Sequence, residues 1–223
     1  MFVTDTLVLG NNKMARQFYL TSGHTSQGGL DAVFADIIKQ AKVISVNVLN
    51  VAFPSKDKRD EKARQYVGQF NRLGISAGIH DPTDDIDLTK KRLSRAEMLY
   101  LPGGDTEYML RTLEESGLSE SIKGFQGPVC GNSAGAYVLT PAYLRIGRGE
   151  PEIIPATGIL PIHLKCHYNP KFDKDLRALS ETREILALED PSMVKYEGDV
   201  RGGVMHVSGN VWRFFMGEKQ RVP

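Results

Sequence analysis

Strand-like and helix-like segments alternate through the first half of the chain. Residues 43–53, VISVNVLNVAF, form a β-branched run of the kind found in strands that are buried on both faces of a sheet. Apolar residues then recur at helical spacing from Ala63 to Leu73, and Gly74 ends that segment. Because this order of elements is typical of βα units, it predicts an α/β fold with a mostly parallel central sheet, flanked by helices on both faces.

Further segments continue this pattern before and after residues 43–73. Toward the C-terminus the period changes to two, in VKYEGD and in GGVMHVSGNVWRFF, which predicts antiparallel hairpin strands with a turn at SGN. Residues 1–15 fit neither pattern, and we interpret them as an extra edge strand or an extension. The other expected elements are strands at residues 17–23, 75–79 and 97–105 and helices at residues 30–41, 88–96 and 106–116.

The composition fits a single α/β domain, residues 1–223, because 41% of the residues are hydrophobic and a chain of this length normally has one core. The 28 basic and 27 acidic residues give a net charge of +1, so there is no electrostatic reason to expect a nucleic acid or an anionic membrane as partner. The sequence has no apolar run of the roughly 20 residues that span a bilayer, and we expect no signal peptide because no basic segment precedes an apolar one at residues 1–17. With only Cys130 and Cys166 it has no disulfide framework. We therefore expect a cytoplasmic protein, either a monomer or a homodimer.

The segment GPVCGNSAGAYVLT, residues 127–140, places a serine between an apolar strand and the start of a helix. This serine has a glycine two positions away on each side, which is the G-x-S-x-G pattern of a nucleophile elbow in its expected strand–turn–helix context. A sharp turn leaves no space for side chains at Gly131 and Gly135, and the following helix directs free N–H groups toward an anion formed at Ser133. The alternative interpretation is that Ser133 only caps the helix.

The loop PGG, residues 102–104, follows a strand and precedes a helix. In a parallel sheet this loop lies at the same carboxyl edge as Ser133, where ligands bind. Because glycine has no Cβ, an N–H of Gly103 or Gly104 can approach a carbonyl oxygen and form a two-donor oxyanion hole with the N–H of Ala134. The alternative is that the glycines only turn the chain and a polar side chain after them caps the next helix.

A serine nucleophile needs a base, and the chain has five histidines. His24 and His80 are expected on loops. We favour His167, because it ends a strand-like segment and precedes a YNP turn at which an imidazole can face a cleft. His206 is expected on the solvent face of a strand, although a triad that used it would follow the Ser–acid–His order of an α/β-hydrolase. The HLKCH segment that begins at His163 is not expected to bind a metal, because no second ligand pair follows at zinc-like spacing.

The third member of a triad is a carboxylate that holds the imidazole in its productive tautomer. The segment LALEDPSMV offers Glu189 and Asp190 at the end of an apolar run, and the residues alone do not decide between them. An ordinary solvent-exposed turn is the alternative for this segment. The cationic side chains that could recognise a substrate are those of Arg145, Arg148 and Lys165, which follow the serine in the sequence. The simpler interpretation is that water solvates them.

In this order, YLPGGDT, GNSAGA, CHY and LALEDPSMV resemble the motifs of the aspartyl dipeptidase (dipeptidase E) family of serine peptidases. The similarity runs from about Gln17 to Trp212, and its most specific part is the GGDT loop followed by the GNSAGA elbow. The resemblance implies a class I glutamine amidotransferase-like fold. It also implies a triad in the chain order Ser–His–acid, on Ser133, His167 and Asp190.

The chain departs from this family pattern in three respects, the first of which is a segment between His167 and Asp190 that is short for an aspartyl dipeptidase. The typical acid of the family is a glutamate in a Gly/Ala-Leu-x-Glu-Gly context, whereas ALEDP here matches it with Asp190 by position and with Glu189 by residue type. Tyr137 stands where aspartyl dipeptidases have an asparagine after SAGA. The resemblance implies a serine peptidase for short peptides that needs no metal or organic cofactor, and the departures argue against a strict preference for an N-terminal aspartate.

Two other functions stay open on the sequence, and a third, that of a cyanophycin-degrading relative with the same elbow, is disfavoured by the short chain. The main hypothesis is hydrolysis through an acyl-enzyme on Ser133, with the oxyanion held by N–H groups of Gly103, Gly104 and Ala134. The first alternative is an α/β-hydrolase-like esterase that uses His206 as its base. The second is a non-catalytic binding protein that keeps the fold.

Overall fold

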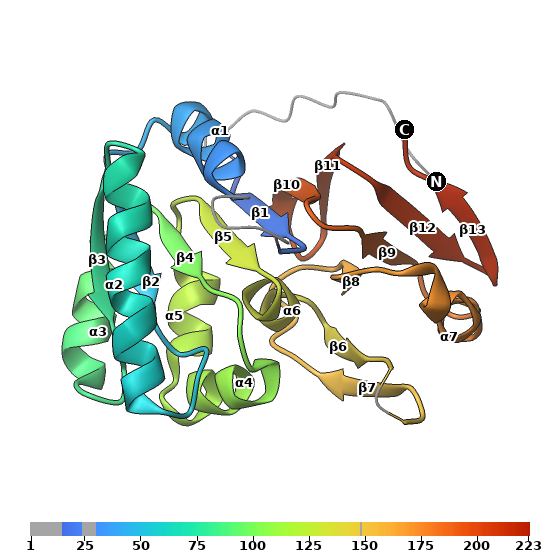
Figure 1. The fold of residues 1–223 in the computed structure, drawn as a ribbon, viewed down its shortest axis with the longest axis horizontal. Helices are drawn as coiled ribbons and strands as arrows, with labels where there is room; N and C mark the ends of the chain where they lie inside the picture. The colour runs from blue at the N-terminus through green and yellow to red at the C-terminus, as the bar shows by residue number, and fades with distance from the viewer. Residues whose placement is uncertain (1–14, 24–29, 148) are drawn as a thin grey trace.

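A seven-stranded sheet forms the centre of the molecule (Figure 1). The computed structural model describes residues 15–23, 30–147 and 149–223, so the expectations for residues 1–14, His24 and Arg148 lie outside the described residues. The strand order is β11-β10-β1-β5-β4-β2-β3, in which β1 to β5 pair in parallel and β10 and β11 are antiparallel, as predicted. The strands are β1 (Gln17–Thr21), β2 (Ser45–Leu49), β3 (Ser76–His80), β4 (Leu99–Leu101), β5 (Val129–Asn132), β10 (Met193–Asp199) and β11 (Gly202–Ser208).

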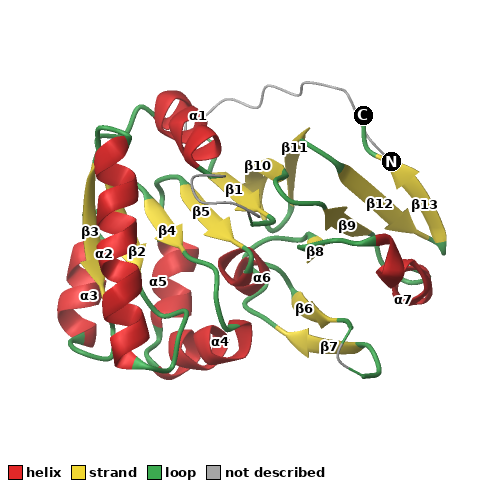
Figure 2. Cartoon of the chain, in the orientation of Figure 1, coloured by secondary structure: helices red, strands yellow, loops and turns green. Residues whose placement is uncertain are grey.

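Helices cover both faces of this sheet, which confirms the predicted arrangement (Figure 2). In β4, Tyr100 packs with α1 and α2 on one face, while Leu99 and Leu101 pack with α3 to α6 on the other, so the strand is buried on both sides. None of the helices in the described part of the chain is long and apolar enough to cross a lipid bilayer. The helices are α1 (Asp31–Ala41), α2 (Lys56–Arg72), α3 (Ile86–Leu93), α4 (Thr106–Glu115), α5 (Leu118–Gly124), α6 (Ala134–Leu139) and α7 (Asp173–Leu179).

Two smaller sheets complete the structure, and Figure 1 shows them on the far side of α6 from α2 and α3. One has the strand order β13-β12-β9-β8, and the other is the hairpin β6-β7. A short 3-10 turn, Pro170–Phe172, precedes α7. The strands of these sheets are β6 (Ala142–Arg145), β7 (Glu152–Pro155), β8 (His163–Lys165), β9 (Ile185–Leu188), β12 (Val211–Phe215) and β13 (Glu218–Arg221).

The prediction that SGN closes a hairpin is wrong. β11 pairs with β10, whereas β12 pairs with β9 and β13, so residues 208–210 carry the chain from the central sheet to the second sheet. Ser192 holds this segment: its Oγ donates to the carbonyl of Asn210 at 3.0 Å and accepts from the N–H of Asn210 at 3.0 Å. A Cβ at Gly209 would lie 2.8 Å from the carbonyl oxygen of Pro191. Contacts with a distant segment, rather than a local turn, therefore fix the path.

The sheet topology brings several loops to one edge. Because β4 and β5 are parallel neighbours, residues 102–104 and Ser133 leave the sheet at the same carboxyl edge, as predicted. On the other side of β5, β1 ends at Thr21. β10 runs antiparallel to β1 and begins with Met193 opposite Thr21, so the segment just before it, which carries Asp190, arrives at the same edge.

The turn between β5 and α6 has no space for side chains at its two glycines. A Cβ at Gly131 would lie 2.5 Å from the carbonyl oxygen of Gly135. A Cβ at Gly135 would lie 2.0 Å from the carbonyl oxygen of Leu101 in β4. Both distances are far below van der Waals contact, so the structure supports the packing reason given for the G-x-S-x-G pattern.

Gly135→Ala is expected to destabilise the fold by about 3 kcal/mol or more, because neither the β4 backbone nor the turn can move aside cheaply. For a chain of this size such a loss lowers the thermal unfolding midpoint by about 10 °C, which differential scanning calorimetry measures. Gly124→Ala is the matched control, since no atom lies within 4 Å of a Cβ built there. Equal midpoints for the two variants would contradict this account of the turn.

Candidate active site

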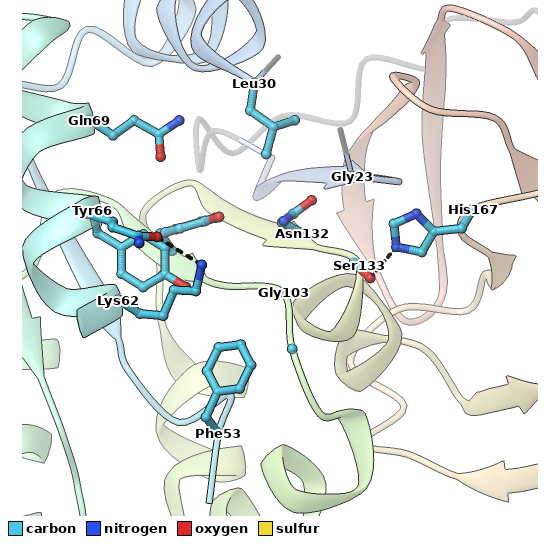
Figure 3. Close-up of a pocket in the computed structure, with 13 residues that line it drawn as sticks. Gly23, Leu30, Phe53, Lys62, Tyr66, Gln69, Gly103, Asn132, Ser133 and His167 are labelled. Carbon is cyan, nitrogen blue, oxygen red and sulfur yellow. Dashed lines mark hydrogen bonds between the residues drawn. The ribbon is translucent and has the colours of Figure 1, made fainter. Parts of the chain in front are cut away.

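Ser133 lies between β5 and α6 in a conformation that few non-glycine residues adopt, with φ 49° and ψ −105°. Its N–H donates to the carbonyl of Thr21 at 2.8 Å, and its carbonyl accepts from the N–H groups of Ala136 and Tyr137. Its side chain makes no capping bond with α6. Instead, Oγ lies 2.7 Å from Nε2 of His167 (Figure 3). The hydroxyl therefore has a partner other than the helix, contrary to the helix-cap alternative.

His167 lies between Ser133 and a carboxylate. Nδ1 of His167 is 2.6 Å from Oδ2 of Asp190. The N–H of Tyr168 donates to the carbonyl of Leu188 at 2.8 Å, which extends the parallel pairing of β8 and β9 beyond the strands. The two segments that follow β8 and β9 thus run side by side, and this brings the imidazole to the carboxylate.

The proton positions follow from the chemistry of the partners. An ionised carboxylate can only accept a hydrogen bond, so a neutral His167 bonded to Asp190 carries its proton on Nδ1. Nε2 is then the acceptor, and the Ser133 hydroxyl donates to it. The Asp190 side chain is 15% exposed and that of His167 is 49% exposed, so the imidazole faces the cleft while its carboxylate partner is shielded from water. The arrangement can move a proton from the serine to the imidazole.

Tyr137 fixes the residue that precedes His167. Its hydroxyl accepts from the N–H of Cys166 at 2.8 Å and donates to the carbonyl of Cys166 at 3.2 Å. The side chain is buried, and it belongs to α6, the helix that starts at the serine. One side chain therefore ties the helix after Ser133 to the segment that carries the imidazole. In the sequence, Tyr137 stood out only as a departure from a family pattern.

Gly103 and Gly104 lie beside the serine. A Cβ at Gly103 would be 3.4 Å from Cβ of Ser133, and a Cβ at Gly104 would be 2.3 Å from the carbonyl oxygen of Ala52. Within the described residues, the N–H groups of Gly104 and Ala134 donate to no other backbone carbonyl. The absence of side chains at Gly103 and Gly104 keeps the space beside Ser133 open.

The two acidic candidates differ in their contacts. Asp190 contacts His167, as described above. Glu189 instead accepts hydrogen bonds from Nε1 of Trp212 at 2.8 Å and from Nδ2 of Asn210 at 3.0 Å. The Glu189 carboxylate therefore bonds to Trp212 of β12 and to Asn210, just before that strand, rather than to the imidazole.

The other described histidines lie away from the serine. His206 is on the edge strand β11, where its Nε2 is 4.0 Å from a carboxylate oxygen of Glu197. His80 was expected on a loop, but it is the buried last residue of β3 and contacts Asn47. His163 is in β8. Among the described residues, no group of three or more His, Cys, Asp or Glu side chains is placed to hold a metal ion.

Two cavities meet at Ser133 and His167. One, of about 440 Å³, extends toward α2, and Figure 3 shows Lys62, Tyr66 and Gln69 across it from the serine and the imidazole. The other, of about 800 Å³, lies between α4, α6, the β6-β7 hairpin and β8. Ser133 and His167 therefore lie where the two cavities adjoin.

The cationic candidates are not simply solvated. Arg145 forms ion pairs with Glu107, at 2.7 Å, and with Glu152. Lys165 is only 8% exposed, and its ammonium lies 4.7 Å from the centre of the Phe172 ring. Both line the larger cavity. The solvated interpretation is therefore wrong for Lys165.

Two further residues of the site gave no functional signal in the sequence. A Cβ at Gly23 would lie 2.4 Å from Cε1 of His167, so the chain after β1 packs directly on the imidazole only because this residue is glycine. The Oδ1 of Asn132 accepts from the Thr21 hydroxyl at 2.9 Å, and this bond ties the end of β5 to β1. Gly23 follows a strand in a small polar segment, a context too common to point to an active site.

A serine on a strained strand–helix turn, followed in series by an imidazole and a carboxylate at the carboxyl edge of a mostly parallel sheet, is the arrangement of a serine hydrolase. Residues 19–201 match the model of peptidase family S51. The chain belongs to this family.

The chain is also similar to individual proteins. The chain is 29% identical over 159 residues to peptidase E of Streptomyces coelicolor, and the match spans 61% of this chain and 63% of that protein. A crystal structure of a peptidase from an acI-B1 actinobacterium superposes with a TM-score of 0.74 and 19% identity, covering 94% of this chain and 95% of the other. A putative peptidase E from Listeria monocytogenes gives a TM-score of 0.65 and 15% identity, covering 87% of this chain and all of the other. At these identities the two structures show that the fold is shared.

Proposed function

We propose that the protein is a serine peptidase that cleaves short peptides through an acyl-enzyme on Ser133. The observation that carries the proposal is the 2.7 Å contact between Oγ of Ser133 and Nε2 of His167, made by a serine that does not cap its helix. Membership of peptidase family S51 and similarity to a peptidase E support a peptide substrate. The order Ser133, His167, Asp190 along the chain also differs from the Ser–acid–His order of α/β-hydrolases.

In the first half of the reaction, the Ser133 hydroxyl gives its proton to Nε2 of His167 as Oγ attacks the scissile carbonyl carbon. The N–H groups of Gly104 and Ala134 then stabilise the negative oxygen of the tetrahedral intermediate. The imidazolium donates its proton to the leaving nitrogen, the C–N bond breaks, and the new amine departs. Asp190 holds the ring orientation and stabilises the imidazolium throughout.

In the second half, water takes the place of the departed amine. His167 accepts a proton from this water, whose oxygen attacks the acyl carbon. The second tetrahedral intermediate uses the same two N–H donors. It collapses when the imidazolium returns a proton to Oγ of Ser133, so the products are an amine and a carboxylic acid and the enzyme is restored.

The test combines active-site labelling with a substrate panel. The wild type is expected to react with a fluorophosphonate, and mass spectrometry of the digested protein is expected to place the adduct on Ser133. It is also expected to hydrolyse some members of a panel of dipeptides with acidic, neutral and basic N-terminal residues. A protein that neither labels nor cleaves any of them would be a non-catalytic binding protein. Labelling that accompanies cleavage of esters but not of peptides would indicate an esterase.

Tyr137→Phe is expected to lower kcat about tenfold with little change in KM. The variant keeps the ring that fills the space in α6 but loses the two hydrogen bonds to Cys166, so His167 is held less accurately while the cavities stay as they are. Steady-state kinetics on the best dipeptide measures both constants. Tyr143→Phe is the control, because its ring packs against Tyr137 at 4.8 Å and also lines the larger cavity. Equal losses in both variants would argue against a positioning role for Tyr137.

A further inference from the structure

Lys165 is a buried cation in the cavity next to the serine. It is the last residue of β8, two positions before His167, and it lines the cavity of about 800 Å³ that Ser133 and His167 also line. Only 8% of the residue is exposed. Within the described residues no carboxylate lies within ion-pair distance of its ammonium, which is 4.7 Å from the centre of the Phe172 ring.

The other cations of this cavity are in a different situation. Arg145 is neutralised by Glu107 and Glu152. Arg111 is exposed and stacks on the ring of Tyr108, with 5.6 Å between the guanidinium and the ring centre. Lys165 therefore combines deep burial with the lack of a carboxylate partner in the described part of the chain.

This combination favours an anionic ligand. Burial lowers the pKa of Lys165, because the charged form loses its water, and the positive charge of Lys171 acts in the same direction. A carboxylate that enters the cavity supplies an opposite charge, and a hydrogen bond to a charged group in such a place is stronger than one at the surface.

The position of Lys165 indicates which carboxylate of a peptide it meets. In the proposed reaction, His167 gives a proton to the leaving nitrogen, so the leaving residue lies on the imidazole side of the bond. Lys165 is on the same segment as His167, and of the two cavities that His167 shares with Ser133 it lines the larger one, so the inference places the leaving residue in that cavity. In a dipeptide the leaving residue is the last one, and its α-carboxylate is within one residue's length, about 3.6 Å of chain, of that nitrogen. In a longer peptide or an amide, a neutral amide group occupies this place.

We propose that Lys165 binds the terminal carboxylate of the leaving residue and so selects dipeptides over dipeptide amides and tripeptides. The inference rests on the proposed peptidase function and names the residue that sets substrate length.

The experiment compares kcat/KM for three substrates that share the N-terminal residue preferred in the panel, Xaa: Xaa-Ala, its amide Xaa-Ala-NH2, and Xaa-Ala-Ala. The wild type is expected to prefer Xaa-Ala over the amide by at least about tenfold, the size of a hydrogen bond to a charged group. Lys165→Met, which keeps the length of the side chain, is expected to lose this preference. The loss is expected through slower cleavage of Xaa-Ala, with cleavage of the amide unchanged within about twofold.

Two further variants separate binding from structural effects. Lys165→Arg keeps the charge and is expected to retain a preference for the free carboxylate. Lys174→Met is the control, because Lys174 is an exposed lysine on α7 that does not line this cavity. It is expected to behave as the wild type.

Several results would overturn the inference. A preference that persists in Lys165→Met, or equal losses for acid and amide, shows that Lys165 does not bind the terminal carboxylate. If Lys165→Met instead lowers kcat/KM for Asp-Ala-NH2 while leaving kcat/KM for Ala-Ala-NH2 unchanged, Lys165 binds an acidic N-terminal side chain. Fluorophosphonate labelling separates these failures from failure of the proposed function. A wild type that labels and cleaves dipeptides without preferring the free acid refutes only the role of Lys165, whereas one that neither labels nor cleaves refutes both.

Discussion

Ser133→Ala is expected to lower kcat by on the order of a million-fold, the loss seen when a nucleophile that acts as one unit with its base is removed. The variant loses Oγ, the atom that forms the acyl-enzyme. It keeps the backbone bonds that hold the turn, since these join the Ser133 N–H to Thr21 and the Ser133 carbonyl to Ala136 and Tyr137. The thermal unfolding midpoint is therefore expected to stay near that of the wild type.

Single-turnover and steady-state kinetics on the best dipeptide measure this loss, and the histidine variants complete the set. His167→Ala is expected to cost about as much as Ser133→Ala, because the two side chains act together. His206→Ala is expected to behave as the wild type, since His206 lies on the edge strand β11 beside Glu197. If His206→Ala abolished turnover while His167→Ala spared it, the base would be assigned wrongly. Substantial turnover by Ser133→Ala would exclude the acyl-enzyme itself.

The tight turn between β5 and α6 was predictable because its packing is local. Gly131 contacts Gly135 within the turn, and Gly135 contacts Leu101 of β4, so neither position has space for a side chain. This requirement for glycine is visible as a short pattern in the sequence. The loop at residues 102–104 could be placed at the same edge for a related reason, because neighbouring parallel strands release their loops on one side of the sheet. The mostly parallel sheet likewise followed from the alternation of strand and helix periods.

The second sheet was not predictable in the same way. The strands β8 and β9 are too short to give a clear period. The path at residues 208–210 depends on hydrogen bonds between Ser192 and Asn210, which are too far apart in the sequence to belong to one local pattern. The β6-β7 hairpin and the short helices α5 and α7 also went unpredicted, because a few residues carry too little periodicity. Partners that come from different elements, such as Tyr137 with Cys166, leave no mark in any one segment.

The sequence also could not predict which of Glu189 and Asp190 contacts the imidazole. Both are carboxylates at the end of one apolar run, so composition and position cannot separate them. The structure directs them to different partners: Asp190 reaches Nδ1 of His167 at 2.6 Å, and Glu189 reaches Trp212 and Asn210. Only the register of β9 against its neighbours determines which of two adjacent side chains meets the imidazole.

Asp190→Asn is therefore expected to lower kcat on the order of ten-thousand-fold at neutral pH. An amide in place of the carboxylate can donate to Nδ1, which stabilises the tautomer with the proton on Nε2, and that tautomer cannot accept the proton of Ser133. The change leaves the nucleophile and the oxyanion donors in place, so the loss is expected in kcat with KM little changed.

Glu189→Gln is the matched comparison, one position away and with the same loss of charge. It is expected to leave kcat within a few-fold of the wild type, because the side chain bonds to Trp212 and Asn210 and not to the imidazole. Steady-state kinetics on both variants shows which carboxylate acts with His167. Thermal unfolding midpoints exclude a general loss of structure. The reverse result, a large loss for Glu189→Gln and a small one for Asp190→Asn, would mean that the working enzyme pairs His167 with the other carboxylate, and that the contact at 2.6 Å is not the one used in catalysis.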